Sequence, residues 1–260
     1  MTSIYYWATK TSSADFDYDV NFATLKKKFS GEAVRFDDNA FRLNSFSGHA
    51  LAGAYYYLIA RDNNLSRIES FLWSFATSSI YEFFIELPEV ASINDFIVTP
   101  VAGATIGEAM YQFGRYFRCS KNKDTLMYQI TSTIMDPIAL INSFIFDDTH
   151  YKFKETCYYN SIQSEFSIFG GMSTVYHENT AHFENGFIFR FHGTLYLLPD
   201  YGQASDIKRF FRDTVLTEMG LEAIVTDTGV DSLRFLAKTV WSAYHRQKIA
   251  RTSSALSLIA

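Results

Sequence analysis

The spacing of hydrophobic residues changes once along the chain, from a helical period before about residue 146 to simple alternation after about residue 158. Apolar residues three and four apart indicate helices, whereas strict alternation indicates strands. Residues 66–87 are apolar on nearly every side except for a polar stripe that recurs every four residues: Ser70, Ser74, Ser78, Glu82 and Glu86. The pattern predicts an α+β protein with an N-terminal helical half followed by an antiparallel β meander.

Local signals for the start of a helix divide the helical half into separate helices. Ser66 and Glu69 have the spacing of a capping box, and Asp136-Pro137 offers a cap followed by proline at the first helical position. Thr99-Pro100 gives the same kind of signal, so a helix is expected from about residue 100 to 118, after a short turn at Ser92. Helices are predicted over about 47–61, 66–87 and 100–118, over a segment ending at 135, and over 138–146.

Long alternating segments follow at 161–176, 187–197 and 215–225, and from 233 onward. Gly170-Gly171 interrupts the first of them, which predicts a bulge or bend. Strands this long exceed the usual ~5–6 residues and match the ~9–11 residues of membrane barrels. Because a closed barrel needs about eight strands, we expect either an open sheet or a partial barrel that further chain segments or subunits complete.

The alternation also predicts which side chains share a sheet face. One set should lie in an apolar environment, lipid or core: Phe187, Phe189, Phe191, Met219, Leu221 and Trp241. The other set should face water: Arg190, Glu218, Glu222 and Lys238. The expected organisation is an extended or loosely helical arm over 1–40, a helical domain over 41–148, antiparallel strands over 158–250 and a tail over 251–260.

Composition narrows the classes of function. The chain has 260 residues, a net charge of −5 and 17% aromatic residues, an aromatic excess that suits membrane-interface girdles or a large aromatic core. The acidic balance and the lack of Lys/Arg clusters argue against a nucleic-acid partner. No signal peptide and no spanning helix are recognisable, so we expect a cytosolic protein or a mature or truncated chain. Cys119 and Cys157 allow either one disulfide or two free thiols.

The candidate chemistry lies in the helical half. Gly103 and Gly107 leave one helix face bare, so that another backbone can approach, and Glu108 follows directly. Residues 92–108 form either a buried helix with a polar end or a polar pocket that consists of Asn94, Asp95 and Glu108. Buried carboxylates need partners, and the cationic candidates are His49, Arg61 and Arg115. The Glu82 and Glu86 stripe either joins this interior or faces water.

A histidine with carboxylates can supply general acid–base chemistry. The candidate catalytic residues are therefore His49, Glu82, Asp95 and Glu108. No metal-spaced histidine pair, nucleophile elbow or phosphate loop accompanies them, so no metal and no cofactor are predicted.

The motifs H-x3-G-x-YY, S-x3-S-x3-S-x3-E and SIND-x3-TP-x2-G-x3-GE resemble an uncharacterised bacterial family of unknown function, which is found in envelope proteins that look like outer-membrane barrels. The likeness is densest from about residue 36 to 142 and departs at Tyr81, where the family pattern has tryptophan. Besides the candidate acids and His49, the matching positions are: Gly53, Arg61, Ser74, Ser78, Glu86, Ser92, Asn94, Pro100, Gly103 and Gly107.

The resemblance implies a bacterial outer-membrane or periplasmic location, with membrane lipid as a partner. We expect a structural or transport protein whose helical domain caps or plugs a barrel. The alternative is an envelope enzyme that acts on lipid or cell-wall material through the His/Glu/Asp pocket. A third alternative is a soluble binding module with helices layered on an antiparallel sheet.

Overall fold

A computed structural model describes residues 20–32, 34–35, 48–146, 162–177, 182–197, 207–211, 215–247 and 253–259 of the chain. The chain divides into two compact units, residues 1–108 and 109–260. The boundary lies inside one long helix, whereas the sequence pattern placed it between residues 148 and 158. The α+β class is confirmed, because helices precede about residue 146 and strands follow residue 162.

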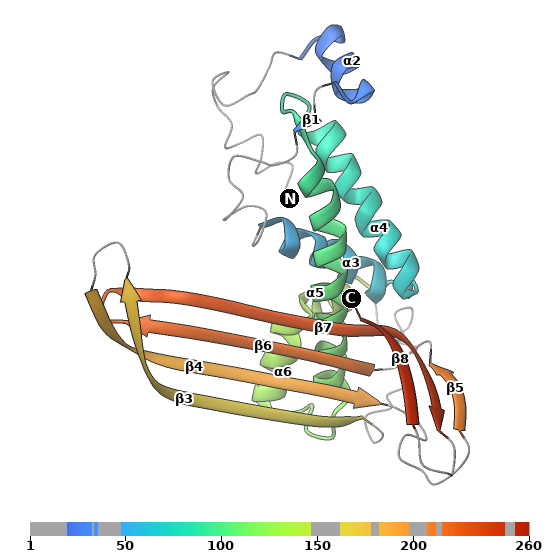
Figure 1. Cartoon of the computed structure of the whole chain (residues 1–260). Coiled ribbons are helices and arrows are strands. Elements are labelled where there is room, and N and C mark those ends of the chain that lie inside the picture. Colours follow the sequence, from blue (N-terminus) through green and yellow to red (C-terminus); the bar gives the residue numbers. More distant parts are fainter. Residues whose placement is uncertain are drawn as a thin grey trace. The chain divides into compact units, whose positions relative to one another are not determined.

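The first unit is helical, with one short parallel strand pair in which Val34 lies beside Ala91 (Figure 1). Its elements are α2 (Phe22–Ser30), β1 (Val34–Arg35), α3 (Ala50–Asp62), α4 (Arg67–Ile80), the π-helix η3 (Tyr81–Ile85), β2 (Ala91–Ser92) and the first part of α5 (Ile93–Cys119). Helix α2 falls within the expected arm. The Asn21 side chain caps it, and Gly31 ends it in the left-handed conformation.

The predicted helix starts are right in one case here and wrong in another. The Ser66–Glu69 capping box at the start of α4 has both of its reciprocal bonds. Helix α5, however, begins at Ile93 rather than at Pro100, which lies inside it. The Ser92 hydroxyl accepts a bond from the Asp95 amide (3.3 Å) and so serves as the cap. A proline in the helix interior removes one backbone bond, and this helix continues in spite of that loss.

The second unit joins the last turns of α5, residues 109–119, to two short helices and a six-stranded antiparallel sheet. Its further elements are α6 (Leu126–Met135), α7 (Pro137–Ile145), β3 (Gln163–His177), β4 (His182–Leu197), β5 (Ile207–Phe211), β6 (Val215–Thr226), β7 (Gly229–Gln247) and β8 (Ser253–Ile259). As predicted, Asp136 caps α7 and Pro137 is its first residue. Residues 253–259, assigned to a tail from the sequence, form β8.

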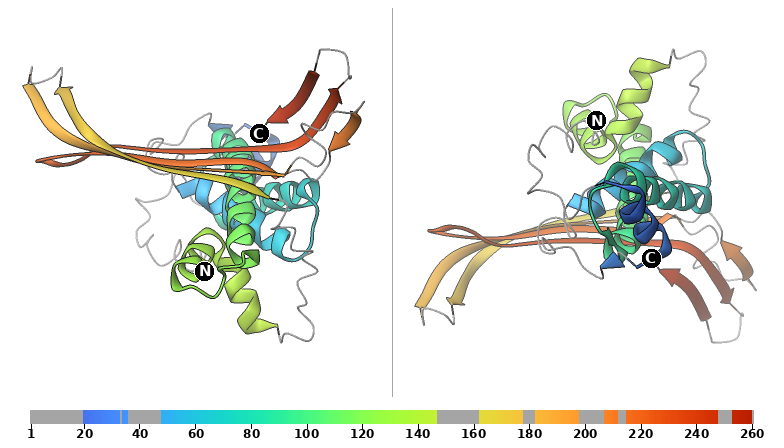
Figure 2. Two further views of the ribbon diagram at one scale, coloured as in Figure 1. Left: turned by 90° about the horizontal axis from the view of Figure 1, so that it is seen from below. Right: turned by 90° about the horizontal axis from the view of Figure 1, so that it is seen from above.

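The four long strands lie side by side in the order β3-β4-β6-β7 and twist along their length (Figure 2). Strand β7 then pairs with both β5 and β8 through its C-terminal part. Among the described strands this order begins at β3 and does not return to it, so their sheet is open.

Of the bulge or bend expected at Gly170-Gly171, the bulge is wrong, whereas strand β3 does curve along its length (Figure 1). Strands β3 and β4 pair without a register shift from Gln163 to His177. The ring of Phe187 lies 3.6 Å from the Cβ position of Gly170, and Phe169 and Ile188 lie similarly close to that of Gly171. Neighbouring side chains fill the space that the glycines leave, and the pairing of β3 with β4 is uninterrupted.

The register assigns alternate residues to two faces. Phe187, Phe189 and Phe191 lie on one face with Val225, Ala223 and Leu221 opposite them on β6, and we call this the apolar sheet face. Its end near Gly193 is covered within the same unit by α5, because the Phe113 ring lies 3.0 Å from the Cβ position of Gly193. Nearby, the Tyr116 and Ser164 hydroxyls are 2.8 Å apart.

The opposite face, which we call the polar sheet face, carries the residues that were expected to face water. On it Arg190 lies beside Glu222, and Glu218 lies beside Lys238. None of the described helices is both long and apolar enough to cross a membrane. Cys119 is disulfide-bonded, and the other cysteine of the chain, Cys157, lies outside the described residues.

Candidate functional site

Small residues bring α3 and α5 into backbone contact in the first unit. A Cβ atom added to Gly53 would overlap the Thr99 carbonyl, and one added to Gly103 would overlap the Gly53 backbone. One turn further along, a Cβ on Gly107 would lie 2.9 Å from the Ala54 carbonyl oxygen. The bare face predicted from Gly103 and Gly107 is therefore the face that α3 crosses. Because the backbones touch, the polar side chains beside this crossing are shut away from water.

Glu108 is the most completely enclosed of the candidate acids, with 0% of its surface exposed. Its carboxylate accepts bonds from the Tyr57 hydroxyl (2.7 Å), from Arg61 Nε (2.8 Å) and from Arg67 Nε (2.9 Å). Burial, followed by the Glu108 charge, raises the pKa of Tyr57 far above its ordinary value, so this hydroxyl remains a donor. We call these four side chains the Glu108 cluster.

The Glu108 cluster is suited to holding helices together rather than to catalysis. Two guanidinium groups and a phenol donate hydrogen bonds to the carboxylate, and two of these three partners are themselves buried. These partners leave the carboxylate no contact with water, since Glu108 has 0% of its surface exposed. Of the expected cationic partners, Arg61 is confirmed as a partner of Glu108, and Arg67 is one that the pattern did not suggest.

Glu82, Asp95 and His49 form a second group, linked through Ser92. Glu82 lies in the π-helical turn, and its Oε1 accepts the Ser92 amide at 2.5 Å. The Ser92 hydroxyl in turn accepts the Asp95 amide, and His49 Nε2 lies 3.7 Å from Asp95 Oδ1. Both carboxylates are buried, whereas the His49 side chain is 23% exposed. We call these four residues the Ser92 cluster.

A third carboxylate borders the Ser92 cluster. Burial, followed by the charges of Glu82, Glu89 and Asp95, raises the pKa of Glu86 to about 8. The buried ammonium of Lys28 donates to the Glu86 and Glu89 carbonyl oxygens at 2.6 and 2.9 Å. A group that titrates near neutral pH beside other carboxylates can exchange protons under physiological conditions.

The polar stripe of α4 faces inward, which decides the alternative that the sequence left open. Ser70, Ser74, Ser78 and Glu82 are all buried, and the Ser74 hydroxyl donates to the Gly53 carbonyl at 3.2 Å. Among the apolar residues between them, Leu72 and Trp73 are exposed. The water-facing interpretation of this stripe is therefore wrong at Glu82.

The four candidate catalytic residues thus fall into two groups. His49, Glu82 and Asp95 are connected through Ser92, while Glu108 belongs to the other cluster. Asn94 lies in α5, and its side chain is outside the described part of the structure. The described residues contain no group of three His, Cys, Asp or Glu side chains that could hold a metal ion.

Comparison with known proteins agrees with the family resemblance. No curated protein and no solved structure matches the chain. Residues 33–138 match a family described as Domain of unknown function (DUF3943), and this segment includes both clusters and the α3–α5 crossing. The match confirms that the helical part of the chain resembles an uncharacterised family of unknown function.

Proposed function

We propose that this chain is a bacterial envelope protein with a structural or transport role. Its sheet forms part of an outer-membrane-type β-barrel, which further chain segments or subunits complete, and its helical domain caps one end of that barrel, where α5 covers the apolar sheet face near Gly193. The observation that carries the proposal is the division of the long strands into one apolar and one polar face. Strands of a membrane barrel alternate in this way between lipid and lumen.

The apolar sheet face supports lipid contact because most of it lies open. Met172 is 93% exposed and Leu233 is 67% exposed. Burying one such side chain away from water would contribute roughly 1.5–3 kcal/mol of stabilisation. Patches of this kind mark interaction or membrane surfaces. The exposed members are: Phe166, Ile168, Met172, Phe187, Phe189, Leu221, Val225, Val230, Leu233 and Phe235.

Strand length and the polar face support the same proposal. Strands β3, β4, β6 and β7 contain 15, 16, 12 and 19 residues. A tilted strand needs about 9–11 residues to cross a bilayer, so each is long enough. The polar sheet face offers charged side chains to a water-filled lumen, among them Arg190, Glu222 and Lys238.

The helices of the first unit also favour an apolar environment. Helix α4 buries its serines and exposes Leu72 and Trp73, and α5 exposes Ile93, Ile97 and Val101 at four-residue spacing. Small residues at helix crossings, inward polar groups and outward apolar groups are the arrangement found where lipid replaces water. The disulfide at Cys119 supports an oxidising compartment such as the periplasm.

Vesicle flotation tests the proposal. The refolded chain should float with phospholipid vesicles, and Leu233→Glu should reduce the floating fraction because it places a charge on the apolar sheet face. Ser232→Glu is the matched control, since this neighbour lies on the polar sheet face opposite Ile224. A wild-type chain that stays at the bottom of the gradient, or equal effects of both substitutions, would contradict the proposal.

A second candidate function rests on the Ser92 cluster. The partly exposed His49 beside Asp95, together with the raised pKa of Glu86, could support an envelope enzyme that acts on lipid or cell-wall material by proton transfer. If the cluster is catalytic, Glu82→Gln should abolish complementation of a deletion strain while the melting temperature is kept. If the cluster only holds the helices, the melting temperature should fall while complementation persists at permissive temperature. No change in either assay would remove the cluster from consideration.

A further inference from the structure

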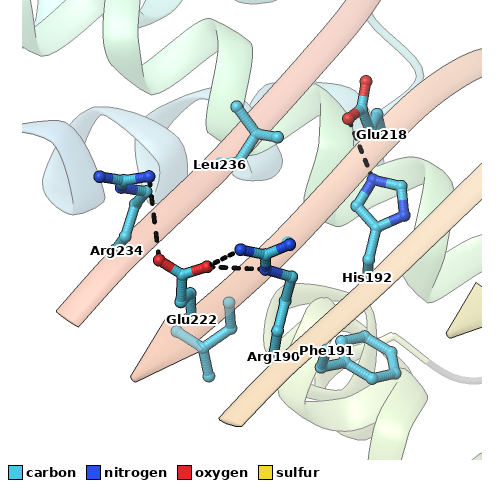
Figure 3. Close-up of a pocket in the computed structure, with 9 residues that line it drawn as sticks. Arg190, Phe191, His192, Glu218, Glu222, Arg234 and Leu236 are labelled. Carbon is cyan, nitrogen blue, oxygen red and sulfur yellow. Dashed lines mark hydrogen bonds and ion pairs between the residues drawn. The ribbon is translucent and has the colours of Figure 1, made fainter. Parts of the chain in front are cut away.

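The polar sheet face contains a hollow of about 270 Å³ (Figure 3), and Gly220 of β6 is one of the residues that line it. Gly220 lies between Glu218 and Glu222 along its strand, with His192 opposite it on β4 and Leu236 opposite it on β7. Gly220 itself is buried, and because it has no side chain the space above it is bounded by the side chains of its neighbours. The surrounding side chains form its rim: Arg190, His192, Glu218, Glu222, Arg234 and Leu236.

The backbone does not require glycine at position 220. Its φ lies outside the left-handed region, and the register passes through it without a shift. A Cβ atom there would lie 3.5 Å from His192 Cδ2 and 3.7 Å from Leu236 Cβ, which are ordinary contacts. Glycine weakens the interior of a strand, and it often marks a place where a ligand approaches the backbone.

The charges around the hollow leave one guanidinium available. Arg190 directs both Nε and Nη2 to a single oxygen of Glu222, Oε2. Arg234 Nη1 lies 3.8 Å from the other oxygen, beyond hydrogen-bond distance, and its side chain is 76% exposed. Figure 3 shows this arrangement, with Arg234 on the opposite side of Glu222 from Arg190. Arg234 therefore keeps donors that can bind a planar oxyanion with two parallel hydrogen bonds.

The charged groups around the rim restrict the charge of an anion that can bind in the hollow. Glu218 is shared by His192 (3.0 Å) and Lys238 (3.1 Å), and Glu165 lies on the same face of β3, opposite Thr194. These carboxylates would repel a dianion, whereas a single negative charge can be placed beside Arg234. Leu236 gives the hollow an apolar wall that suits a short hydrocarbon chain.

We propose that the Gly220 hollow binds a small organic monocarboxylate. Arg234 binds the carboxylate group, and the short aliphatic chain lies over Gly220 against Leu236. This inference does not depend on the envelope role, because all of its residues belong to one sheet face of the second unit.

Isothermal titration of the purified full chain with butyrate tests the proposal. Butyrate should bind, and butylammonium and inorganic phosphate should bind at least tenfold more weakly. Gly220→Val fills the hollow with a residue that favours strands, and it should weaken butyrate binding at least tenfold. Arg234→Gln should do the same, because it removes the charged donors. Lys121→Gln is the matched control, since it removes an exposed cation in the segment between α5 and α6, outside the sheet, and binding should change by less than twofold.

Equal binding of butyrate and butylammonium would overturn the proposal, and so would undiminished binding by Gly220→Val. An effect of Lys121→Gln as large as that of Arg234→Gln would show general charge attraction and would also overturn it. If Gly220→Val fails to fold, Arg234→Gln decides the matter, because its exposed side chain can be changed without disturbing the sheet. The absence of detectable butyrate binding to the wild-type chain would refute it directly.

Discussion

Replacing Glu108 with glutamine should be among the most destabilising single changes in the helical unit. The substitution keeps the shape of the side chain but removes the charge that faces Arg61 and Arg67. An amide oxygen cannot satisfy two guanidinium groups and the Tyr57 hydroxyl at once, and its NH₂ group points a donor at other donors. Arg67 is buried and Arg61 nearly so, so neither can recover full hydration.

The magnitude follows from the depth of the cluster. Breaking a buried ion pair by removing one partner costs about 3–5 kcal/mol, against a total stability of about 5–15 kcal/mol for an ordinary domain. For a chain of this size the loss corresponds to a fall in melting temperature of roughly 6–20 °C. Tyr57→Phe removes one of the donors and should cost less, about 1.5–3 kcal/mol.

Urea unfolding followed by circular dichroism gives the comparison. Glu69→Gln is the matched control, because it makes the same chemical change at an exposed position where glutamine can also complete a capping box. It should alter the unfolding free energy by less than about 0.5 kcal/mol. A loss below about 1 kcal/mol for Glu108→Gln would refute the view that the cluster holds the helices together.

Two further predictions concern the same unit. The folded-state pKa of Glu86, about 8, lies above its ordinary value of 4.5, so its contribution to stability is present below about pH 4.5 and lost as the pH rises through 8. The melting temperature should therefore fall more steeply between pH 5 and pH 9 in the wild type than in Glu86→Gln, and parallel pH profiles would contradict this. Gly107→Leu should cost about 1–3 kcal/mol by overpacking against Tyr57 and the α3 backbone. Gly48→Leu, where a Cβ meets open space, should be tolerated, and similar urea midpoints for the two variants would argue against close packing.

Signals that are local in sequence predicted the structure well. The Ser66–Glu69 capping box needs only four consecutive residues, and Asp136-Pro137 needs two, so neither depends on the rest of the fold. The alternation in residues 187–197 fixed the two sheet faces because a strand has a period of two. Thr99-Pro100 misled for the same reason: the signal is local, but the chain was already helical from Ile93.

Features that depend on distant contacts could not be predicted in this way. The partner role of Arg67 joins residues on different helices, and nothing in the local pattern pairs Arg67 with Glu108. The sequence shows the polar stripe of α4, but it does not show whether the stripe faces the protein interior or water. Periodicity shows that a helix has a polar and an apolar face. Assigning the apolar face to the protein interior assumes that water is the solvent. In α4 the buried face is the one that carries the serines, which is the opposite of what this assumption would select.

Strand β7 pairs with β6 through its first part and with β5 and β8 through its last part, which has a consequence for the order of folding. Its first part pairs with β6 across a tight turn at 226–229, a contact that can form within microseconds. Its last part is paired on both edges, with Tyr244 lying beside Phe210 of β5 and Leu256 of β8. Ile207 must reach Gln247 across the whole β6–β7 hairpin, so this pairing closes a much longer loop and forms later. Until β8 has paired, one edge of this part of β7 is a bare template for the strands of other chains. A chaperone that shields residues 240–247 until β8 has paired would therefore increase the yield of folded protein.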